Sequence, residues 1–299
     1  MKVRVRVPAS SANLGPGFDS LGLALSLYNE LVLAEADRVT VVIRGEGAAH
    51  LPADGANVVA RAARMAFEAA GRPFSGVRIE CVNGIPLSRG LGSSAAAWLG
   101  GLLGANALLG TPLDRSAILS LAARAEGHPD NVAAALCGGL TVSCETDNGV
   151  VAVSLPVPEA IRWVALIPEL TGATAEARAV LPAGVPRADA VFNVQRVALL
   201  LASLQAKRAD FLHVAMHDRL HQPYRMKLFP WMAAVVEAAR EAGALGCVLS
   251  GAGPSLLAAV AEDADTVAHA MTRALAAAGV PSVARPLDVD TAGAVTEIS

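Results

Sequence analysis

The sequence GIPLSRGLGSSAAA, residues 84–97, decides the fold more than any other stretch of this chain. A strand-like run precedes it, and a small, apolar segment typical of a helix follows it. Gly90 and Gly92 allow the backbone to turn with positive φ and to approach a ligand closely. Ser93 and Ser94 stand where the helix is expected to begin, and serine is a favoured N-cap. Because a helix N-terminus presents unpaired N–H groups and the positive end of the helix dipole, this loop predicts a phosphate site.

Two better-known phosphate loops fit this stretch less well. A Walker A loop needs a lysine directly after a glycine, and none of the lysines of this chain follows one: Lys2, Lys207 and Lys227. Residues 90–95 do match the G-x-G-x-x-A pattern of a dinucleotide-binding turn. Such a turn starts directly at the end of its strand, whereas residues 83–89 intervene here. A dinucleotide site is therefore the less favoured alternative.

Composition limits the classes of function. With 299 residues, the chain is long enough for one large or two medium domains. Hydrophobic residues make up 54% but aromatic residues only 4%, so we expect a core built mainly of Ala, Val and Leu. The net charge of −3 and the lack of a basic stripe argue against a nucleic-acid partner. The longest apolar stretch, 98–109, is too short to span a bilayer, so no membrane partner is expected.

The N-terminus and the cysteines both favour a cytoplasmic protein. Residues 1–7 alternate charge and valine, which is typical of a strand and not of a signal peptide. The cysteines are scattered and form no C-x-x-C pair, which predicts reduced thiols in a reducing compartment: Cys81, Cys137, Cys144 and Cys247.

The hydrophobic pattern predicts an α+β protein with two groups of elements. In the first group we expect strands at 2–7, within 21–35, and at 38–44 and 77–82, helices at 57–70, 98–109 and 115–125, and a hairpin over 141–155. A boundary is expected at 153–158. In the second group we expect strands at 161–168, 247–250, 256–260 and 280–287, and helices at 174–181, 187–207, 210–220, 231–242 and 265–278.

Two loops concentrate polar side chains. The first loop comprises residues 9–19, because Pro8 is expected to end the preceding strand. Besides its serines, the strongly polar residues of this loop are Asn13 and Asp19. A turn held by Asx hydrogen bonds would explain this loop as well as a ligand would. The second loop, EGHPDN at 126–131, places four polar side chains between two apolar helices. Such a loop predicts a site more readily than a simple connection.

Other polar residues carry weaker signals. His217 and His221 are four residues apart on an expected helix and could share a metal ion. No third ligand has a sensible spacing and the H-E-x-x-H pattern is absent, so surface or packing histidines are favoured. Arg178 and Arg225 lie near helix ends, where single arginines are usually solvated.

Three loops taken together resemble those of the GHMP kinases, the family of galactokinase, homoserine kinase, mevalonate kinase and phosphomevalonate kinase. They read PASSANLGPGFD at 8–19, PLSRGLGSSA at 86–95 and SGAGPS at 250–255. Within this family, EGHPDNVA at 126–133 and HQPYR at 221–225 resemble the homoserine kinases. The resemblance extends from residue 3 to about residue 260.

The resemblance implies an α+β GHMP kinase fold with two domains. Residues 1–158 would form an ATP-binding domain of the ribosomal-protein-S5-like type, and residues 159–299 a ferredoxin-like domain. ATP would lie between them, and the third loop would brace the phosphate loop. The residues implied in ATP binding are Pro86, Leu87, Ser88, Arg89, Gly90, Leu91, Gly92, Ser93, Ser94 and Ala95. The family often dimerises, so a homodimer is one expected assembly.

The reaction implied is the ATP-dependent phosphorylation of L-homoserine to O-phospho-L-homoserine, in threonine biosynthesis. By the same resemblance, the substrate would be bound by Asn13, Asp19, His128, Asn131, Thr174, Arg178 and Arg225. The chemistry of these side chains agrees with a zwitterionic substrate. Asp19 is a suitable partner for an ammonium group, and Arg178 and Arg225 offer planar forks for a carboxylate.

Catalysis is expected to involve Asn131, His128 and Ser94, with Mg²⁺ bound by Ser94 and Glu126. Mevalonate-kinase-like members commonly have an aspartate base where Asn131 stands, and an amide cannot abstract a proton. We therefore expect no obligatory protein base, with positioning and charge neutralisation carrying the reaction. Relatives often show two acids spaced Glu-x-Glu at the metal, and Arg124 replaces the first of them here.

Two other interpretations stay open at this point. The chain could be a GHMP kinase that acts on another small hydroxy acid or alcohol. It could also be a nucleotide-binding regulator that retains the fold without turnover, which the Arg124 substitution would fit.

Overall fold

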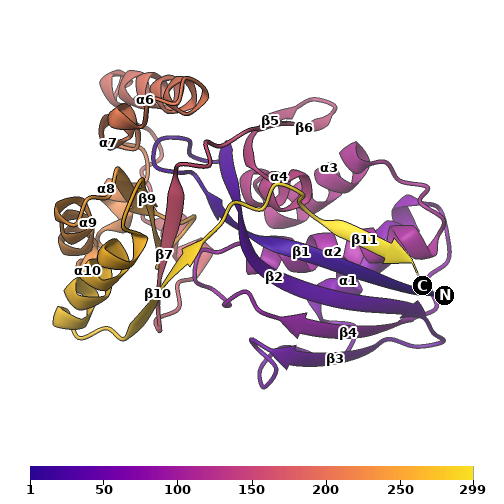
Figure 1. Ribbon diagram of the computed structural model, residues 1–299. Helices are drawn as coiled ribbons and strands as arrows, with labels where there is room; N and C mark the ends of the chain where they lie inside the picture. The colour runs from indigo at the N-terminus through magenta and orange to yellow at the C-terminus, as the bar shows by residue number, and fades with distance from the viewer. Residues whose placement is uncertain (299) are drawn as a thin grey trace.

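The computed structural model describes residues 1–298, and two β-sheets organise it (Figure 1). The first sheet has the strand order β11-β1-β2-β4-β3, with β5 added to β2 and β6 added to β5. Its strands are β1 (Lys2–Ala12), β2 (Leu21–Glu35), β3 (Thr40–Gly45), β4 (Val77–Asn83), β5 (Leu140–Thr146), β6 (Gly149–Leu155) and β11 (Val295–Ile298). The helices packed against it are α1 (Val58–Ala69), α2 (Ser93–Leu108), α3 (Arg115–Glu126) and α4 (Asp130–Cys137).

Local sequence signals explain most of this first unit. Along β1, Val3, Val5 and Val7 are buried while the charged residues between them are exposed, as the alternation predicts. Asn57 caps α1 by accepting a hydrogen bond from the N–H of Val59 at 2.9 Å. The alternating pattern and the capping residue therefore place these elements where they were expected.

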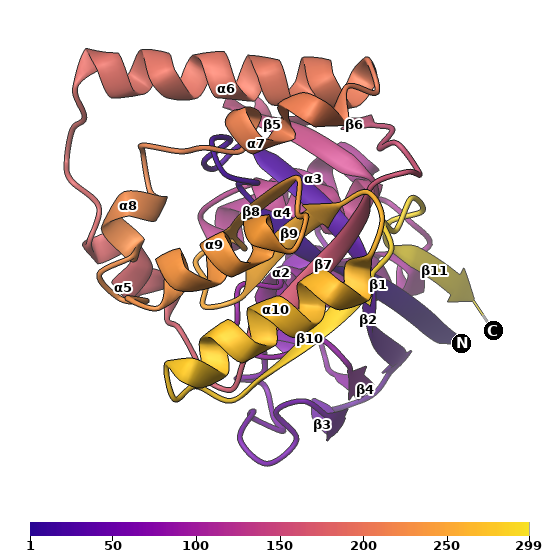
Figure 2. The ribbon, with the colours of Figure 1, turned by 60° about the vertical axis from the view of Figure 1, so that its left-hand side comes forward.

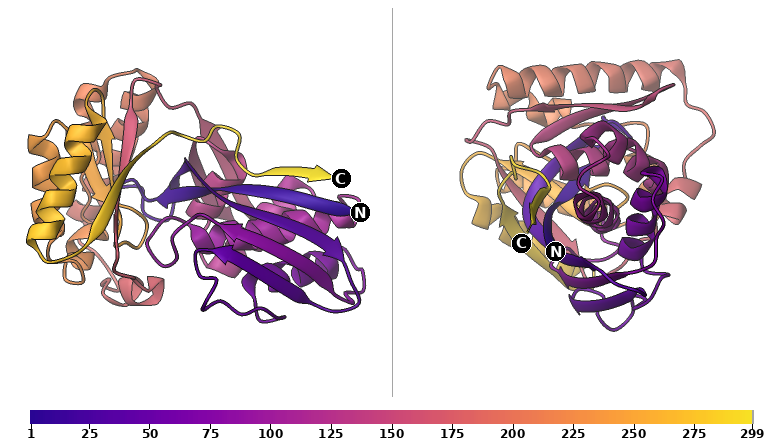
Figure 3. Two further views of the ribbon diagram at one scale, coloured as in Figure 1. Left: turned by 60° about the horizontal axis from the view of Figure 1, so that its bottom comes forward. Right: turned by 90° about the vertical axis from the view of Figure 1, so that its right-hand side faces the viewer.

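The second sheet has the order β10-β7-β9-β8. Its strands are β7 (Arg162–Pro168), β8 (Gly246–Leu249), β9 (Leu256–Val260) and β10 (Ser282–Leu287), all antiparallel to their neighbours. Helix α9 (Met232–Glu241) precedes β8 and helix α10 (Ala264–Ala277) precedes β10. This βαββαβ arrangement is the expected ferredoxin-like sheet, and Figure 3 shows its two helices on the face turned away from the first sheet.

The core is continuous between the two sheets. Alternate residues of β7 divide it: Trp163, Ala165 and Ile167 join the large core of the first unit, while Val164 and Leu166 pack with α9 and α10. Because β7 is covered on both faces, six of its seven residues are buried. The second sheet is thereby held firmly against the first, which fixes the loops between them.

Four helices lie between β7 and α9, and one of them, α6, has 19 residues. They are α5 (Thr174–Ala179), α6 (Arg187–Gln205), α7 (Leu212–Ala215) and α8 (Gln222–Arg225), with a 3₁₀ turn at Ala209–Phe211. Figure 2 shows α6 stretched across the top of the molecule with α7 beneath it. No helix within residues 1–298 combines the length and apolarity needed to cross a membrane.

Two expected boundaries are wrong. The strand at the N-terminus does not end at Pro8 but continues to Ala12, because the pairing with β2 shifts register between Pro8 and Ala9. A bulge of this kind tolerates the missing N–H of proline. The helix expected at 210–220 is limited to the short α7, because the Asp218 carboxylate accepts hydrogen bonds from the N–H groups of Leu220, His221 and Gln222 and so turns the chain into α8.

Candidate active site

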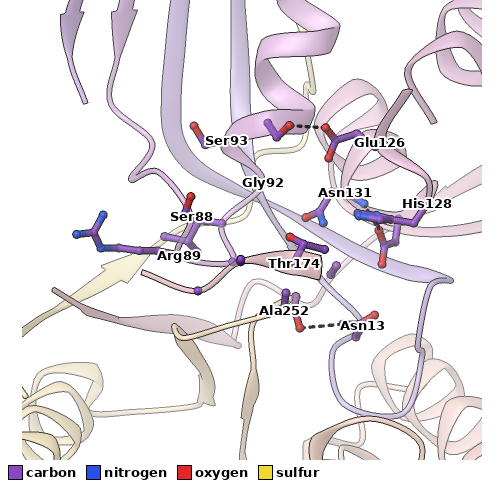
Figure 4. Close-up of a pocket in the computed structure, with 18 of the residues that line it drawn as sticks. Asn13, Ser88, Arg89, Gly92, Ser93, Glu126, His128, Asn131, Thr174 and Ala252 are labelled. Carbon is purple, nitrogen blue, oxygen red and sulfur yellow. Dashed lines mark hydrogen bonds and ion pairs between the residues drawn. The ribbon is translucent and has the colours of Figure 1, made fainter. Parts of the chain in front are cut away.

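A cavity of about 160 Å³ lies between the two sheets, where the polar loops of the sequence converge (Figure 4). Most of the predicted site residues line it: Asn13, Asp19, Pro86, Ser88, Arg89, Gly90, Leu91, Gly92, Ser93, Ser94, Glu126, His128, Asn131, Thr174, Arg178 and Arg225. Two do not. Leu87 lines a neighbouring cavity, and Ala95 is fully buried in the core.

The glycine-rich loop delivers the N-terminus of α2 to this cavity. Gly92 is the N-cap residue with φ of 72°, and Gly90 has φ of 74°. The expectation that Ser93 or Ser94 caps the helix is wrong: both lie inside its first turn, and no side chain caps it. The first N–H groups of α2 are therefore not taken by a capping side chain, which suits a phosphate.

The loop at 250–255 braces the phosphate loop, as expected. The Ser250 hydroxyl donates to the carbonyl of Gly90 at 2.6 Å, and the N–H of Ser255 donates to the carbonyl of Arg89 at 3.3 Å. The Arg89 guanidinium donates to the carbonyls of Pro168 and Leu87 at 2.8 and 3.1 Å. Arg89 thus connects the phosphate loop to the end of β7. Its guanidinium N–H groups donate to backbone carbonyls and so are less available to a phosphate.

Ser94 and Glu126 meet at one edge of the cavity. The Ser94 hydroxyl donates to Oε1 of Glu126 at 2.5 Å, and burial raises the pKa of this carboxyl. Arg124, which stands where many relatives have the first of the two acids, is exposed on α3. Within residues 1–298 no group of three or more His, Cys, Asp or Glu side chains could hold a metal ion. One carboxylate and one hydroxyl nevertheless fit Mg²⁺, which usually takes one or two carboxylates and completes its shell with substrate phosphates and water.

His128, Asp130 and Asn131 form a hydrogen-bonded group at the start of α4. Nδ1 of His128 lies 2.7 Å from Oδ1 of Asp130, which also accepts from the N–H of Asn131 at 2.7 Å. Burial opposes protonation of His128, but the bond to Asp130 and the negative charges of Asp130 and Glu126 outweigh it and raise the pKa of the imidazole. The Asp130 carboxylate, only 1% exposed, is thus committed to its neighbours and orients His128.

Asn131 presents a donor to the cavity. Its Oδ1 accepts a hydrogen bond from the Ser10 hydroxyl at 2.9 Å. The amide nitrogen is therefore the group left for a ligand. Figure 4 shows Asn131 and His128 beside each other on the same side of the cavity, below the start of α2.

The opposite end of the cavity carries the charged side chains. Arg178 makes a two-pronged ion pair with Asp19, with nitrogen–oxygen distances of 2.7 and 3.0 Å. Asn13 supports this loop, since its Oδ1 accepts from the N–H of Asp19 at 3.0 Å and its Nδ2 donates to the carbonyl of Gly251 at 3.1 Å. Arg225 is buried, which lowers its pKa to about 10, so it remains a cation at neutral pH.

Family models place this arrangement among known kinases. The model of the GHMP kinases N terminal domain matches residues 57–139, and that of the GHMP kinases C terminal domain matches residues 200–277. Together they cover more than half of the chain. The chain belongs to the GHMP kinase family.

Homoserine kinases are among its most similar relatives. The chain is 46% identical to the homoserine kinase of Moorella thermoacetica over 97% of this chain and 98% of the relative. It is 43% identical to that of Desulfitobacterium hafniense over 98% and 99%. The crystal structure of homoserine kinase from Cytophaga hutchinsonii superposes with a TM-score of 0.90 at 31% identity, over 99% of this chain and 97% of that one. The predicted family and two-domain fold are confirmed.

A second, apolar cavity in this GHMP kinase was not expected from the sequence. It measures about 340 Å³ and shares Ser88, Ser93 and Ser94 with the first cavity. Its apolar walls come from α1, α2 and strands of the first sheet, and include Ile43, Leu51, Val58, Cys81, Leu87 and Ala97. Apolar residues scattered over so many elements look like ordinary core in a sequence, so no motif marks this site.

The structure favours the packing interpretation of His217 and His221 over a shared metal ion. His217 follows α7, whereas His221 is completely buried just before α8. Nε2 of His221 lies 2.7 Å from the carbonyl oxygen of Gly15, so this histidine has a packing role, as the sequence favoured.

Proposed function

We propose that this GHMP kinase transfers the γ-phosphoryl group of ATP to the side-chain hydroxyl of L-homoserine, giving O-phospho-L-homoserine and ADP. The homoserine kinases that match it over nearly their full length support this reaction. The observation that carries it is the cavity itself, which combines a free helix N-terminus at one end with Asp19, Arg178 and Arg225 at the other. Such a cavity fits a phosphate donor next to a zwitterion.

The charged end would bind the amino-acid part of the substrate. The ammonium would replace Arg178 as the partner of Asp19, and the carboxylate would take the released Arg178 together with Arg225. Each substrate charge would then find its opposite in a half-buried site, where charge-assisted hydrogen bonds are strong. Mevalonate carries no ammonium, and Asp19 would be a poor neighbour for it.

The nucleotide would occupy both cavities. Its phosphates would lie at the N-terminus of α2, and its nucleoside would extend past Ser88 and Ser93 into the apolar cavity, which opens beside them. The order of the two cavities supports this placement, because the shared serines stand between the apolar walls and the polar site.

Mg²⁺ would be held by Ser94 and Glu126. Such an ion neutralises charge on the β- and γ-phosphates when it is bound. The half-buried carboxyl of Glu126, with its raised pKa, gains a cationic partner in this arrangement, which stabilises its ionised form.

The remaining residues would orient the reacting groups. Asn131 Nδ2 and His128 would direct the substrate hydroxyl towards the γ-phosphorus. The hydroxyl oxygen forms the new P–O bond, the bond to the β-phosphate oxygen breaks, and the hydroxyl proton passes to an oxygen of the transferred phosphoryl group. Asp130 is a poor candidate for a base, because its carboxylate already serves His128 and the N–H of Asn131. Positioning and charge neutralisation suffice for a loose transition state.

Coupled ADP release tests this proposal. Mg-ATP is supplied with L-homoserine, D-homoserine, mevalonate or shikimate in parallel. A selective signal with L-homoserine is the expected result. Activity only with another alcohol would retain a kinase and discard the roles of Asp19, Arg178 and Arg225, and ATP binding without any turnover would favour a regulator. A cytoplasmic location and a homodimer remain predictions.

A further inference from the structure

His221 is buried where loop 13–19 meets α8, and both of its ring nitrogens are in use. Nε2 lies 2.7 Å from the carbonyl oxygen of Gly15, and Nδ1 lies 3.1 Å from Nη1 of Arg225. A carbonyl can only accept and a guanidinium can only donate, so Nε2 carries the proton and Nδ1 accepts. The imidazole is therefore neutral, in agreement with the lowering of its pKa by burial.

The backbone around His221 is fixed by Asp218, whose side chain is completely buried. The Asp218 carboxylate accepts from the N–H groups of His221 and Gln222 at 3.0 and 2.7 Å, and from Nδ2 of Asn193 at 2.7 Å. Nδ2 of Asn193 also donates to the carbonyl of Pro16 at 2.9 Å. Loop 13–19 is thus held from the second sheet's side at two successive carbonyls, one by His221 and one by Asn193.

His221 also decides how Arg225 faces the cavity. The Arg225 Nε donates to the carbonyl of Ala177 at 3.1 Å, and Nη1 donates to the carbonyl of Gly251 at 3.0 Å and to His221. Within residues 1–298, Nη2 has no such partner, and Arg225 lines the cavity. The three acceptors leave one orientation of the guanidinium, in which Nη2 serves a ligand.

One ring thus connects the two halves of the charged site. Phe18 adds a contact of the same kind, since its ring stacks on His221 with centroids 5.2 Å apart and lies 5.4 Å from the Arg225 guanidinium carbon. A shift of His221 would change the distance between Arg225 and Asp19, which belongs to the loop that His221 holds.

We propose that His221 is a positioning residue that sets the spacing between the carboxylate-binding Arg225 and the ammonium-binding loop of Asp19. It thereby selects substrates that carry both groups on one carbon atom. This inference rests on the proposed function, because it takes Arg225 and Asp19 as the two ends of a zwitterion site.

The test compares His221→Phe with His221→Gln. Phenylalanine retains an aromatic ring against Phe18 but removes both hydrogen bonds, whereas the glutamine amide can still donate to Gly15 and accept from Arg225. The readouts are kcat, the KM values for L-homoserine and ATP, and the inhibition constant of 3-amino-1-propanol, a competitor that has the ammonium and hydroxyl but no carboxylate. Thermal unfolding checks that each variant is folded.

We expect His221→Phe to raise the KM for L-homoserine by about 10- to 100-fold, the size expected for a charge-assisted hydrogen bond, with kcat, the KM for ATP and the inhibition constant of 3-amino-1-propanol nearly unchanged. His221→Gln should restore most of the loss. Equal losses for L-homoserine and 3-amino-1-propanol, or no rescue by glutamine, would overturn the inference. If His221→Phe does not fold, His221→Asn replaces it, since its amide is too short to reach both partners. A wild type without homoserine-dependent turnover would instead refute the proposed function.

Discussion

Replacing Gly92 by alanine should separate the stability of the phosphate loop from its catalytic geometry. Gly92 has φ of 72°, and a Cβ there would collide with the Ser10 hydroxyl and approach Oδ1 of Asn131 to 3.2 Å. The left-handed backbone costs an alanine roughly 1–2 kcal/mol, and losing the Ser10–Asn131 hydrogen bond adds about 0.5–1.5 kcal/mol. The free energy of unfolding should therefore fall by about 1.5–3.5 kcal/mol, as measured by urea titration.

Activity should fall further than stability explains, because the collision moves the start of α2 and frees the Asn131 amide to turn. A displacement of about 1 Å at reacting groups can reduce turnover by roughly 100-fold, so we expect a loss of that order in kcat and a higher KM for ATP, measured by coupled ADP release.

Two matched glycines serve as controls for this prediction. Gly71 has φ of 66° but open space around its Cβ position, so Gly71→Ala carries the backbone penalty alone. Gly76 has no positive φ, but a Cβ there would collide with the backbone of Arg38, and neither residue lines the polar or the apolar cavity. Both variants should lose stability and retain kcat. A Gly92→Ala enzyme with wild-type kcat and a loss of stability like that of Gly71→Ala would refute the reasoning.

Three further predictions follow from the site. Glu126→Gln should raise the Mg²⁺ concentration for half-maximal velocity by about tenfold, equivalent to one charge-assisted contact, while the KM for homoserine stays constant; an unchanged Mg²⁺ titration would remove Glu126 from the metal site. Asp130→Asn should lower the pKa of His128 in an NMR titration. The native pKa of His128 is raised above 6.5. The stability that the His128–Asp130 pair contributes is therefore complete below about pH 6.5 and is lost as the pH rises through the native pKa. A difference in the free energy of unfolding between the wild type and Asp130→Asn that grows with pH would contradict this. Ala97→Leu fills the apolar cavity, so the KM for ATP should rise about 10- to 100-fold without a change for homoserine, and an equal effect on both would argue against a nucleoside there.

The fold was largely predictable because its elements carry local signals. Asn57 and Asp114 cap α1 and α3 with their own side chains, and both stand at the start of a helix predicted from the hydrophobic pattern. The errors arose where a distant contact overrides such a signal. Proline ends a strand where the sheet requires a hydrogen bond from its N–H. At Pro8 the pairing with β2 shifts register, so the strand continues without that hydrogen bond. In the sequence, Asp218 resembles any polar residue of a helix. In the structure, its buried carboxylate accepts backbone hydrogen bonds that end the helix and turn the chain.

The candidate site was predictable to the same extent. The glycines and the polar loops are recognisable in the sequence, and in the structure they surround one cavity. Contacts between loops leave no such mark. That Asp19 pairs with Arg178, 159 residues away, depends on how the two sheets pack. The role of His221 depends on Gly15, 206 residues away in the sequence, and the shape of the apolar cavity depends on several elements at once.

The last strand, β11, has a consequence for how the two sheets are held together. It pairs with β1, so the chain leaves the first sheet after β6, builds the second sheet, and returns, and the two termini lie side by side (Figures 1 and 3). Two connecting segments of the chain, 156–161 and 288–294, therefore join the second sheet to the first, rather than one. A body tethered at two points can bend about the line that joins them but cannot swivel freely. Together with the core that β7 shares with the first unit, these two connections keep Asp19 and Arg225 at a fixed mutual position.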